Sequence, residues 1–238
     1  MLKVVRVMEL KLWLSFLLLQ VSHCVQSPGG KWTANVPAVI PALQGSCVVI
    51  PCTYNYPKPK SKKILNRWKG FWKKGNKIMS TNLRKWKLPK EYKRRTKFLG
   101  NLKWHNCTMM LDGIRKTDVG PFYFRIEMPQ YKSFSYINNT VSLLVMSEPD
   151  APTVSAVVNN KVTASCSVSH SCPYIPPRFS WSRPGIVRKR SKKLNAWNWE
   201  TVSTLTFQPL STDFNKTLEC TVLYSGGKQA KSSMILTI

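Results

Sequence analysis

Cys47-Val-Val-Ile-Pro-Cys52 is the stretch that decides the fold of this chain. A short apolar run of β-branched residues, closed at both ends by cysteine, is typical of a strand buried in a core. Cys107 follows 55 positions after Cys52, and Trp68 lies between the two. The spacing predicts a β-rich domain held by a disulfide, with a tryptophan packed near it.

The same arrangement recurs in the second half of the chain. Cys166 is followed by Trp181 and then by Cys220, 54 positions after Cys166. A Cys…Trp…Cys pattern with this spacing, set among short strand-like runs, is the signature of an immunoglobulin sandwich. We therefore expect an all-β protein with two tandem immunoglobulin-like sandwiches, the first of the variable type and the second of the constant type.

Composition agrees with two packed β domains. The chain has 238 residues, of which 43% are hydrophobic and 11% aromatic, enough for cores of ordinary size. Sixteen prolines and eleven glycines argue against a helical protein. The 37 Lys and Arg against 10 Asp and Glu give a formal charge of +27. Three histidines, none at ligand spacing, argue against a metal site, and no cofactor is expected.

The first 24 residues are expected to be a secretory signal peptide. Basic residues precede the apolar run 12–19, which is too short to span a bilayer comfortably. Small residues, Ser22 and Cys24, suit cleavage before Val25. An uncleaved anchor is the alternative. Removal of the signal peptide leaves a formal charge of +25 and six cysteines. An even number of cysteines suits three disulfides in an exported protein. The protein is then extracellular, either secreted or the outer part of a membrane protein.

Strand-like runs and a proline-bracketed linker give the domain ranges. The linker is Glu148-Pro-Asp-Ala-Pro152, which places a variable-type domain at 28–147 and a constant-type domain at 150–238. Apolar or alternating segments are expected to form strands: 47–52, 107–111, 118–124 and 140–145 in the first domain, and 161–166, 178–181, 201–207, 218–222 and 233–238 in the second.

The first domain departs from the usual plan at its expected strand F. Phe124 stands where the second cysteine normally lies, and Phe122 replaces the tyrosine of the corner motif. Cys52 is therefore expected to pair with Cys107 within one sheet. Without a bridge between the sheets, we expect them to sit farther apart and to open the face beside strand F.

The remaining cysteines are expected to form two more disulfides. Cys166–Cys220 is the ordinary bridge of the second domain. Cys47 and Cys172 have no partner within their own domains and both lie near the boundary, so we expect them to join the two domains. Topology selects this connectivity among the possible pairings of six cysteines.

Several of these features together resemble the Siglecs, the sialic-acid-binding immunoglobulin-like lectins. The resemblance covers essentially the whole mature chain as two domains, although the family is not usually this basic. It rests on Gly30-Lys-Trp32, Gln44-Gly-Ser-Cys47 through Cys52, Phe98-Leu-Gly-Asn-Leu102, Asn106-Cys-Thr108, Phe122-Tyr-Phe-Arg125 and Cys166 with Ser171-Cys-Pro173.

The resemblance implies a sialic acid site. Arg125 matches the arginine whose planar guanidinium binds the sugar carboxylate through two hydrogen bonds, a geometry that lysine lacks. Trp32 matches the tryptophan that lies against the N-acetyl group. Tyr131, Phe134 and Ser135 match residues that contact the sugar from the neighbouring strand. The alternatives are an arginine in a surface ion pair, a tryptophan that plugs the sandwich edge, and an ordinary edge strand.

Other residues have structural interpretations. Trp68 and Trp181 are expected to be core tryptophans. Three N-x-Thr sequons predict glycan sites on an exported protein, at Asn106, Asn138 and Asn215, and the adjacent cysteine hinders modification at the first.

The excess positive charge gathers in four runs, with aromatic residues between the cations of the second and third: 58–63, 67–77, 84–97 and 188–193. The first three are expected on loops and strands of the first domain and the last on a loop of the second. Export argues against nucleic acid as the partner. Heparan sulfate, sialylated glycans or anionic membranes are the better candidates, and a solvated face without a partner is the alternative.

The leading hypothesis is an adhesion or recognition lectin for terminal sialic acid on glycoproteins or gangliosides. The alternative is an immunoglobulin module that binds a protein or heparan sulfate through its basic surface and has no sugar site. Enzymatic activity is not expected, because the sequence has no nucleophile with its acid and base partners and no phosphate-binding loop.

Overall fold

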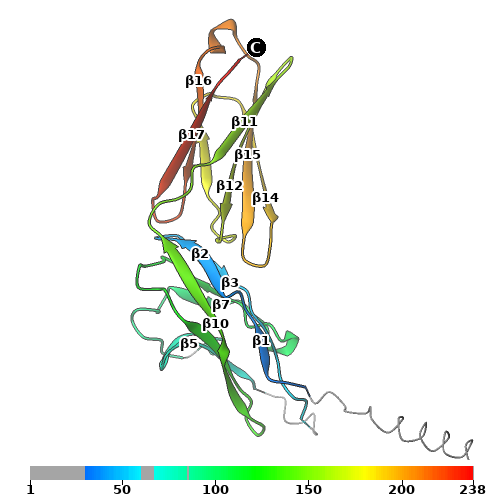
Figure 1. The fold of residues 1–238 in the computed structure, drawn as a ribbon, viewed down its shortest axis with the longest axis vertical. Coiled ribbons are helices and arrows are strands. Elements are labelled where there is room, and N and C mark those ends of the chain that lie inside the picture. The colour runs from blue at the N-terminus through cyan, green and yellow to red at the C-terminus, as the bar shows by residue number, and fades with distance from the viewer. Residues whose placement is uncertain (1–29, 60–66, 85, 238) are drawn as a thin grey trace, which may run out of the picture.

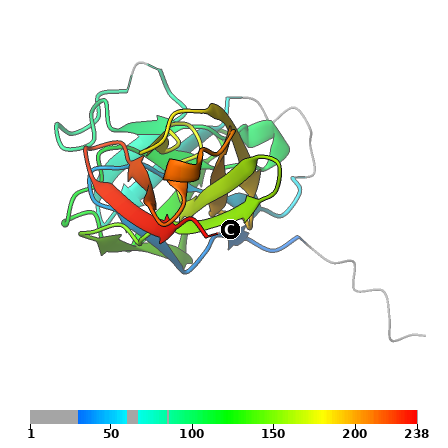
Figure 2. The same cartoon turned by 90° about the horizontal axis from the view of Figure 1, so that it is seen from above.

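The computed structural model describes residues 30–59, 67–84 and 86–237. They form two β-sandwiches stacked end to end, so that the molecule is an elongated rod (Figure 1). Viewed down this rod, the second sandwich lies over the first (Figure 2). The predicted signal peptide and part of the basic run 58–63 lie outside the described residues. The all-β architecture of two immunoglobulin-like sandwiches is confirmed, and the two domain ranges remain our prediction.

The first sandwich is built from a large sheet, a small sheet and a separate antiparallel pair of short strands. The large sheet has the order β2 (Val39–Leu43), β10 (Ser133–Met146), β9 (Phe122–Glu127), β5 (Lys69–Lys74) and β6 (Lys77–Thr81). The small sheet has the order β3 (Val48–Ile50), β8 (Met109–Leu111) and β7 (Thr96–Phe98), and β1 (Thr33–Asn35) pairs with β4 (Thr53–Asn55). A 3-10 helix, η2 (Leu102–Trp104), precedes β8.

Alternation along β9 separates core side chains from surface side chains. Phe122, Phe124 and Ile126 are buried, whereas the residues between them, among them Arg125 and Glu127, are half-buried and face outward. Because successive side chains of a strand point to opposite faces of a sheet, Arg125 is fixed on the outer face of the large sheet.

The tryptophan beside the first disulfide is Trp72, not Trp68. Cys52 and Cys107 form a disulfide within the small-sheet layer, where the Cys107 amide also donates to the Cys52 carbonyl at 2.9 Å. Trp72 on β5 is fully buried, and its Nε1 donates to the Cys107 carbonyl at 2.6 Å. Trp68 precedes β5, is half-buried at the end of the sandwich, and only packs against the core from outside. The prediction for Trp68 was therefore wrong.

Aromatic rings fill the space at the level where the usual disulfide between sheets is missing. Phe124 stacks on Tyr136 with ring centroids 6.0 Å apart and contacts Tyr54 at 5.2 Å and Trp72 at 6.1 Å. The extra room that we expected to open the face beside β9 is thus occupied by large side chains of the core.

The second sandwich has the strand orders expected of a constant-type domain. One sheet runs β11 (Thr153–Val158), β12 (Val162–His170), β15 (Trp199–Phe207) and β14 (Ile186–Lys193), and the other runs β13 (Arg178–Trp181), β16 (Thr217–Leu223) and β17 (Gln229–Ile235). The 3-10 helix η3 (Ser211–Asp213) precedes β16. Cys166 and Cys220 form the bridge between these sheets. Trp181 is half-buried, packs against both core clusters and donates to Ser203 Oγ at 3.1 Å.

The basic run 188–193 is a strand rather than the loop that we predicted. It forms most of β14, which pairs with β15 from Ile186 to Lys193 and is exposed at every position. A strand at the edge of a sheet, with no buried face of its own, has no hydrophobic alternation from which it could be recognised.

A covalent bond and several polar contacts join the two sandwiches. Cys47 and Cys172 form a disulfide, and the Val49 amide donates to the Ser171 carbonyl at 3.1 Å. The hydroxyl oxygens of Ser46 and Ser225 are 3.0 Å apart. These contacts fix the junction between the sandwiches at the end of β3.

No helix within the described residues is long and apolar enough to cross a membrane.

Candidate functional site

Arg125 lies near one end of β9, in the middle of the large sheet. Its neighbour on β10 is Ser135 and its neighbour on β5 is Phe71. Residues that pair across antiparallel strands project from the same face, so these three side chains share the outer face of the large sheet.

Two side chains hold the guanidinium of Arg125. Its Nε donates to Glu127 Oε1 at 3.0 Å, and its Nη1 donates to Ser135 Oγ at 2.9 Å. The side chain of Arg125 remains 31% exposed and that of Glu127 32% exposed. An ion pair so open to water contributes only about 0–1 kcal/mol. An anionic ligand can therefore replace Glu127 at little cost.

Phe71 closes one side of this site. It is buried although it faces outward, because Trp86 covers it with its ring at 5.3 Å in an edge-on arrangement. Trp86 itself is 45% exposed. Phe71 and Trp86 thus form an apolar wall beside Arg125.

The aromatic residues predicted for the site form a second group, which we call the edge cluster: Trp32, Tyr131 and Phe134. Trp32 stacks on Phe134 with centroids 4.6 Å apart and planes at 15°, and on Tyr131 at 6.3 Å. Tyr131 also donates from its hydroxyl to the Pro57 carbonyl at 2.8 Å. All three are half-buried against the core.

The structure does not bring all five predicted residues to one face. Phe134 pairs with Ile126, a core residue, whereas Ser135 pairs with Arg125 on the outer face. Arg125 and Ser135 therefore lie together, and the edge cluster lies on the other side of β10.

A free strand edge separates the two groups. β2 pairs with β10 only from Ser142 to Met146. Among the described strands, none pairs with the segment 133–136 on the side away from β9. Its backbone N–H and C=O groups on that side are left for a ligand, with Arg125 on one side of the edge and Trp32 on the other.

Glu127 and Phe71 are the site residues that we did not predict. The alternating run Phe122-Tyr-Phe-Arg-Ile-Glu127 carried the signal for Glu127, because residues two apart on a strand share a face. Phe71 gave no such signal, since its burial depends on coverage by Trp86 from another segment.

The three sequons differ in exposure. Asn138 on β10 and Asn215 before β16 are exposed. Asn106 is half-buried, and its Oδ1 accepts a hydrogen bond from the Thr108 amide at 2.9 Å. Glycosylation at these positions remains a prediction, with Asn106 the least accessible. Within the described ranges, no group of three or more His, Cys, Asp or Glu side chains is arranged to hold a metal ion.

Comparison with known proteins shows what the chain is similar to. The family model described as B-cell receptor CD22-like, first Ig-like, matches residues 42–148. Human myelin-associated glycoprotein is 26% identical over 195 residues, which is 77% of this chain and 30% of that protein. Sialic acid-binding Ig-like lectin 12 of Mus musculus is 28% identical over 218 residues, 84% of this chain and 44% of that protein. This chain is a Siglec-like protein. Myeloid cell surface antigen CD33 of Mus musculus agrees, at 28% identity over 203 residues, 80% of this chain and 48% of that protein.

The Siglec-like chain spans less than half the length of these relatives. Its relatives are immunoglobulin-type proteins and not enzymes, and the Siglec-like chain is not an enzyme either.

Proposed function

We propose that this protein is an extracellular recognition lectin that binds terminal sialic acid on glycoproteins or gangliosides through Arg125. The observation that carries the proposal is the half-exposed guanidinium of Arg125, held only by Ser135 and an easily displaced Glu127 in a Siglec-like domain. The match to a sialic acid-binding Ig-like lectin supports the choice of ligand.

In this proposal the ligand carboxylate takes the place of the Glu127 carboxylate. Arg125 then donates two parallel hydrogen bonds to the sugar, while Ser135 keeps Nη1 in position. The free edge of β10 offers backbone groups to the sugar hydroxyls. The exposed parts of Trp32 and Phe134 meet the acetamido and glycerol groups where the ligand crosses that edge.

A site with one charged contact and a few apolar contacts binds weakly. A dissociation constant of about 1 mM corresponds to roughly −4 kcal/mol. Adhesion by such a site depends on many copies acting together on a surface, so a multivalent probe is required to observe it.

The proposal is tested by glycan-array binding of a multivalent Fc fusion before and after sialidase. Arg125→Ala and Arg125→Lys should both lose at least tenfold in binding, because lysine cannot form the paired hydrogen bonds. Arg84→Ala, which removes an exposed arginine of the same domain, is the matched control and should bind like the wild type. Binding that survives sialidase and Arg125→Ala would overturn the proposal.

Glu127→Gln tests the exchange of carboxylates. Removing the competing charge should raise sialoside binding by a few fold, since the ligand then no longer displaces an ion pair. A loss as large as that of Arg125→Ala would instead mean that Glu127 is needed to position the arginine.

The alternative is a module that binds a protein or heparan sulfate through its basic surface without any sialic acid site. Binding of that kind should vanish at high ionic strength and should be indifferent to Arg125→Ala.

A further inference from the structure

The outer face of the second sandwich has an unusual composition. The register of its four-stranded sheet gathers eight small hydroxyl side chains on that face, which we call the hydroxyl face: Thr153, Ser155, Thr163, Ser165, Ser167, Ser169, Thr204 and Thr206. The side chains between them on β12 are buried in the core. The hydroxyl face is therefore a shallow surface lined mostly by small polar groups, with Val157 and Val202 among them.

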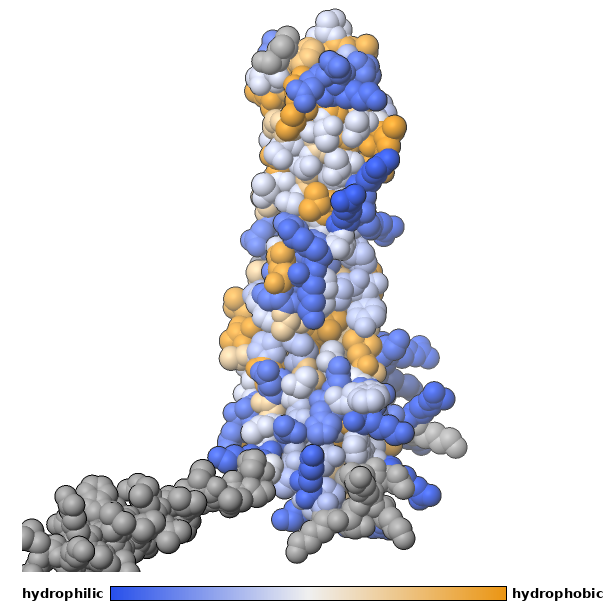
Figure 3. Space-filling view, turned by 90° about the vertical axis from the view of Figure 1, so that its right-hand side faces the viewer, coloured by the Kyte–Doolittle hydropathy of each residue, from blue (hydrophilic) through white to orange (hydrophobic). Residues whose placement is uncertain are grey.

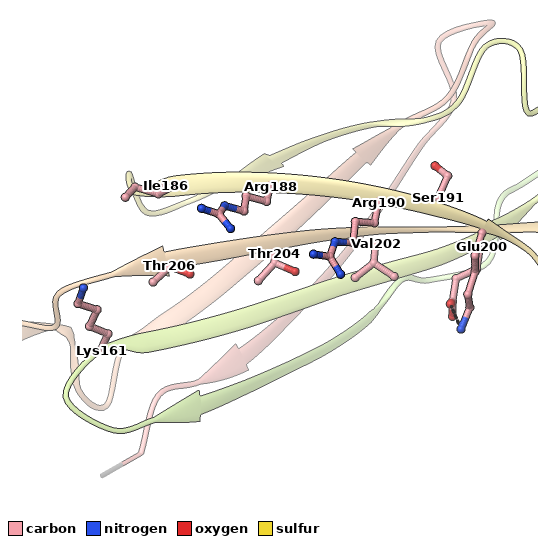
Figure 4. A pocket seen from close by; sticks show the side chains of 10 residues that line it. Lys161, Ile186, Arg188, Arg190, Ser191, Glu200, Val202, Thr204 and Thr206 are labelled. Carbon is pink, nitrogen blue, oxygen red and sulfur yellow. Dashed lines mark ion pairs between the residues drawn. The ribbon is translucent and has the colours of Figure 1, made fainter.

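A row of cations borders the hydroxyl face along β14. Arg188 pairs with Thr204, Arg190 with Val202 and Lys192 with Glu200, so all three project from the outer side of the sheet. Alternate residues of a strand are about 7 Å apart, so the row spans about 13 Å. Lys161, just before β12, adds a further cation near Thr206, at the end of β15 (Figure 4).

This surface forms a groove, because the threonines on β15 are small and the arginines on β14 are large. Its volume is about 790 Å³, and its lining includes Lys161, Arg188 and Arg190 together with Thr204 and Thr206. Figure 4 shows the guanidinium groups of Arg188 and Arg190 on the same side of β14, pointing toward β15. Figure 3 looks at the side of the molecule where Figure 1 places β14 and shows patches of strongly hydrophilic side chains along it.

The positive charge of this groove is mostly uncompensated. Lys192 forms an ion pair with Glu200, with Nζ 2.8 Å from Oε2. Within the described part of the chain, Arg188, Arg190 and Lys161 take part in no ion pair. Glu200 is the single acidic residue among those lining the groove.

We propose that this groove binds a sulfated linear polysaccharide. A row of cations at a regular spacing matches anionic groups repeated along a chain, and a guanidinium binds the oxygens of a tetrahedral anion through paired hydrogen bonds. The hydroxyl face beside the row matches the hydroxyl groups of the sugar rings. None of the outward-facing side chains of the four strands is aromatic, so the face lacks the stacking platform typical of single-stranded nucleic acid sites.

This site is separate from the proposed sialic acid site, because its residues belong to the other sandwich. Binding of sulfated polysaccharide should therefore be unchanged in Arg125→Ala. The two proposals can fail independently.

The test is binding of the intact secreted chain to immobilised heparin at several salt concentrations. Arg188→Gln with Arg190→Gln should weaken binding about tenfold at physiological salt and should reduce the salt dependence. Lys189→Gln with Lys193→Gln is the matched control, because it removes the same charge from the opposite side of β14, and it should lose less than threefold. All four side chains are exposed, so both variants should fold, which circular dichroism can check.

Equal losses in the two double variants would overturn the proposal, because they would indicate attraction to net charge alone. So would competition by desulfated heparin, or by duplex DNA, at the same concentration as heparin. Loss of heparin binding in Arg125→Ala would also overturn it, since the polyanion would then lie on the first sandwich.

Discussion

Trp72 and Trp68 lie four positions apart, yet their indole groups are in different environments. Trp72 Nε1 donates to the Cys107 carbonyl, which ties the large sheet to the layer that holds the disulfide. Trp68 Nε1 is buried without a hydrogen-bond partner among the described residues. The hydrogen bond of Trp72 therefore links the two sheets at the level where β9 lacks the usual disulfide.

Trp72→Phe should destabilise the protein by about 2 kcal/mol, since it removes buried volume and leaves the Cys107 carbonyl without its donor. Trp68→Phe is the matched control and should cost less than about 1 kcal/mol, because it also removes an unpaired buried donor. Urea unfolding of both variants with the disulfides intact measures the difference. Equal losses would contradict the assignment of Trp72 as the tryptophan that links the sheets.

At the level of single residues, the sequence could not show which of these two tryptophans packs beside the disulfide. Positions four apart on a strand share a face, so alternation alone cannot distinguish them. The difference arises from where the strand begins: β5 starts at Lys69 and leaves Trp68 outside it. In the same way, the sequence pointed to Arg125 but could not show that Trp32 and Ser135 lie on opposite sides of β10.

At the level of elements, several strands with a buried face were predictable, whereas β2, β5 and β14 were not predicted. In β15, for example, buried Leu205 and Phe207 alternate with outward-facing Thr204 and Thr206, because one face packs on a core. β14 pairs with β15 alone, and all its side chains are exposed. Lysine and arginine on such an edge also discourage pairing with other chains.

The connection between β8 and β9 depends on one buried ion pair. Arg95 binds Asp118 and also donates to the carbonyls of Glu91, Asp112 and Gly113. The two side chains are only 13% and 6% exposed. Asp118 also accepts from the Arg115 amide at 2.8 Å, so it fixes the turn that leads into β9. The ion pair stabilises this turn, where Phe122 lacks the hydroxyl group of the usual corner tyrosine.

Asp118→Asn should therefore destabilise the first sandwich by about 3 to 5 kcal/mol, because it leaves the buried guanidinium of Arg95 without a counter-charge. Glu91→Gln breaks the exposed pair with Lys77 and serves as the control, with an expected cost within about 1 kcal/mol. Thermal unfolding of the two variants measures both effects. A loss in Asp118→Asn no greater than in the control would show that the corner is held by other contacts.

At the scale of the whole molecule, the junction between the two sandwiches contains a buried histidine. His170 lies beside the residues that clamp the junction, since Ser171 and Cys172 follow it directly. It also lines a cavity of about 230 Å³ to which the first sandwich contributes Pro41 and Leu43. Trp197 from the second sandwich lines the same cavity and packs against the core of the first.

His170 makes this junction sensitive to acid. Burial lowers the pKa of His170 to about 4, and nearby Lys189 contributes to this lowering. An unfolded histidine has a pKa of about 6.5. Between these two values the unfolded chain binds a proton that the folded chain excludes, so stability must fall as the pH falls.

The free energy of unfolding should therefore drop by roughly 2 to 3 kcal/mol from pH 7 to pH 4 on account of His170 alone. Calorimetric melting across this range measures the drop. His170→Gln should flatten the profile between pH 6.5 and 5, where carboxylates contribute least, while both proteins remain folded at pH 7.5. Parallel profiles for the two proteins would mean that water reaches His170 and that the junction opens more readily than its disulfide and backbone contacts imply. A rigid junction, by contrast, keeps the Arg125 site and the β14 groove at a fixed separation on one rod.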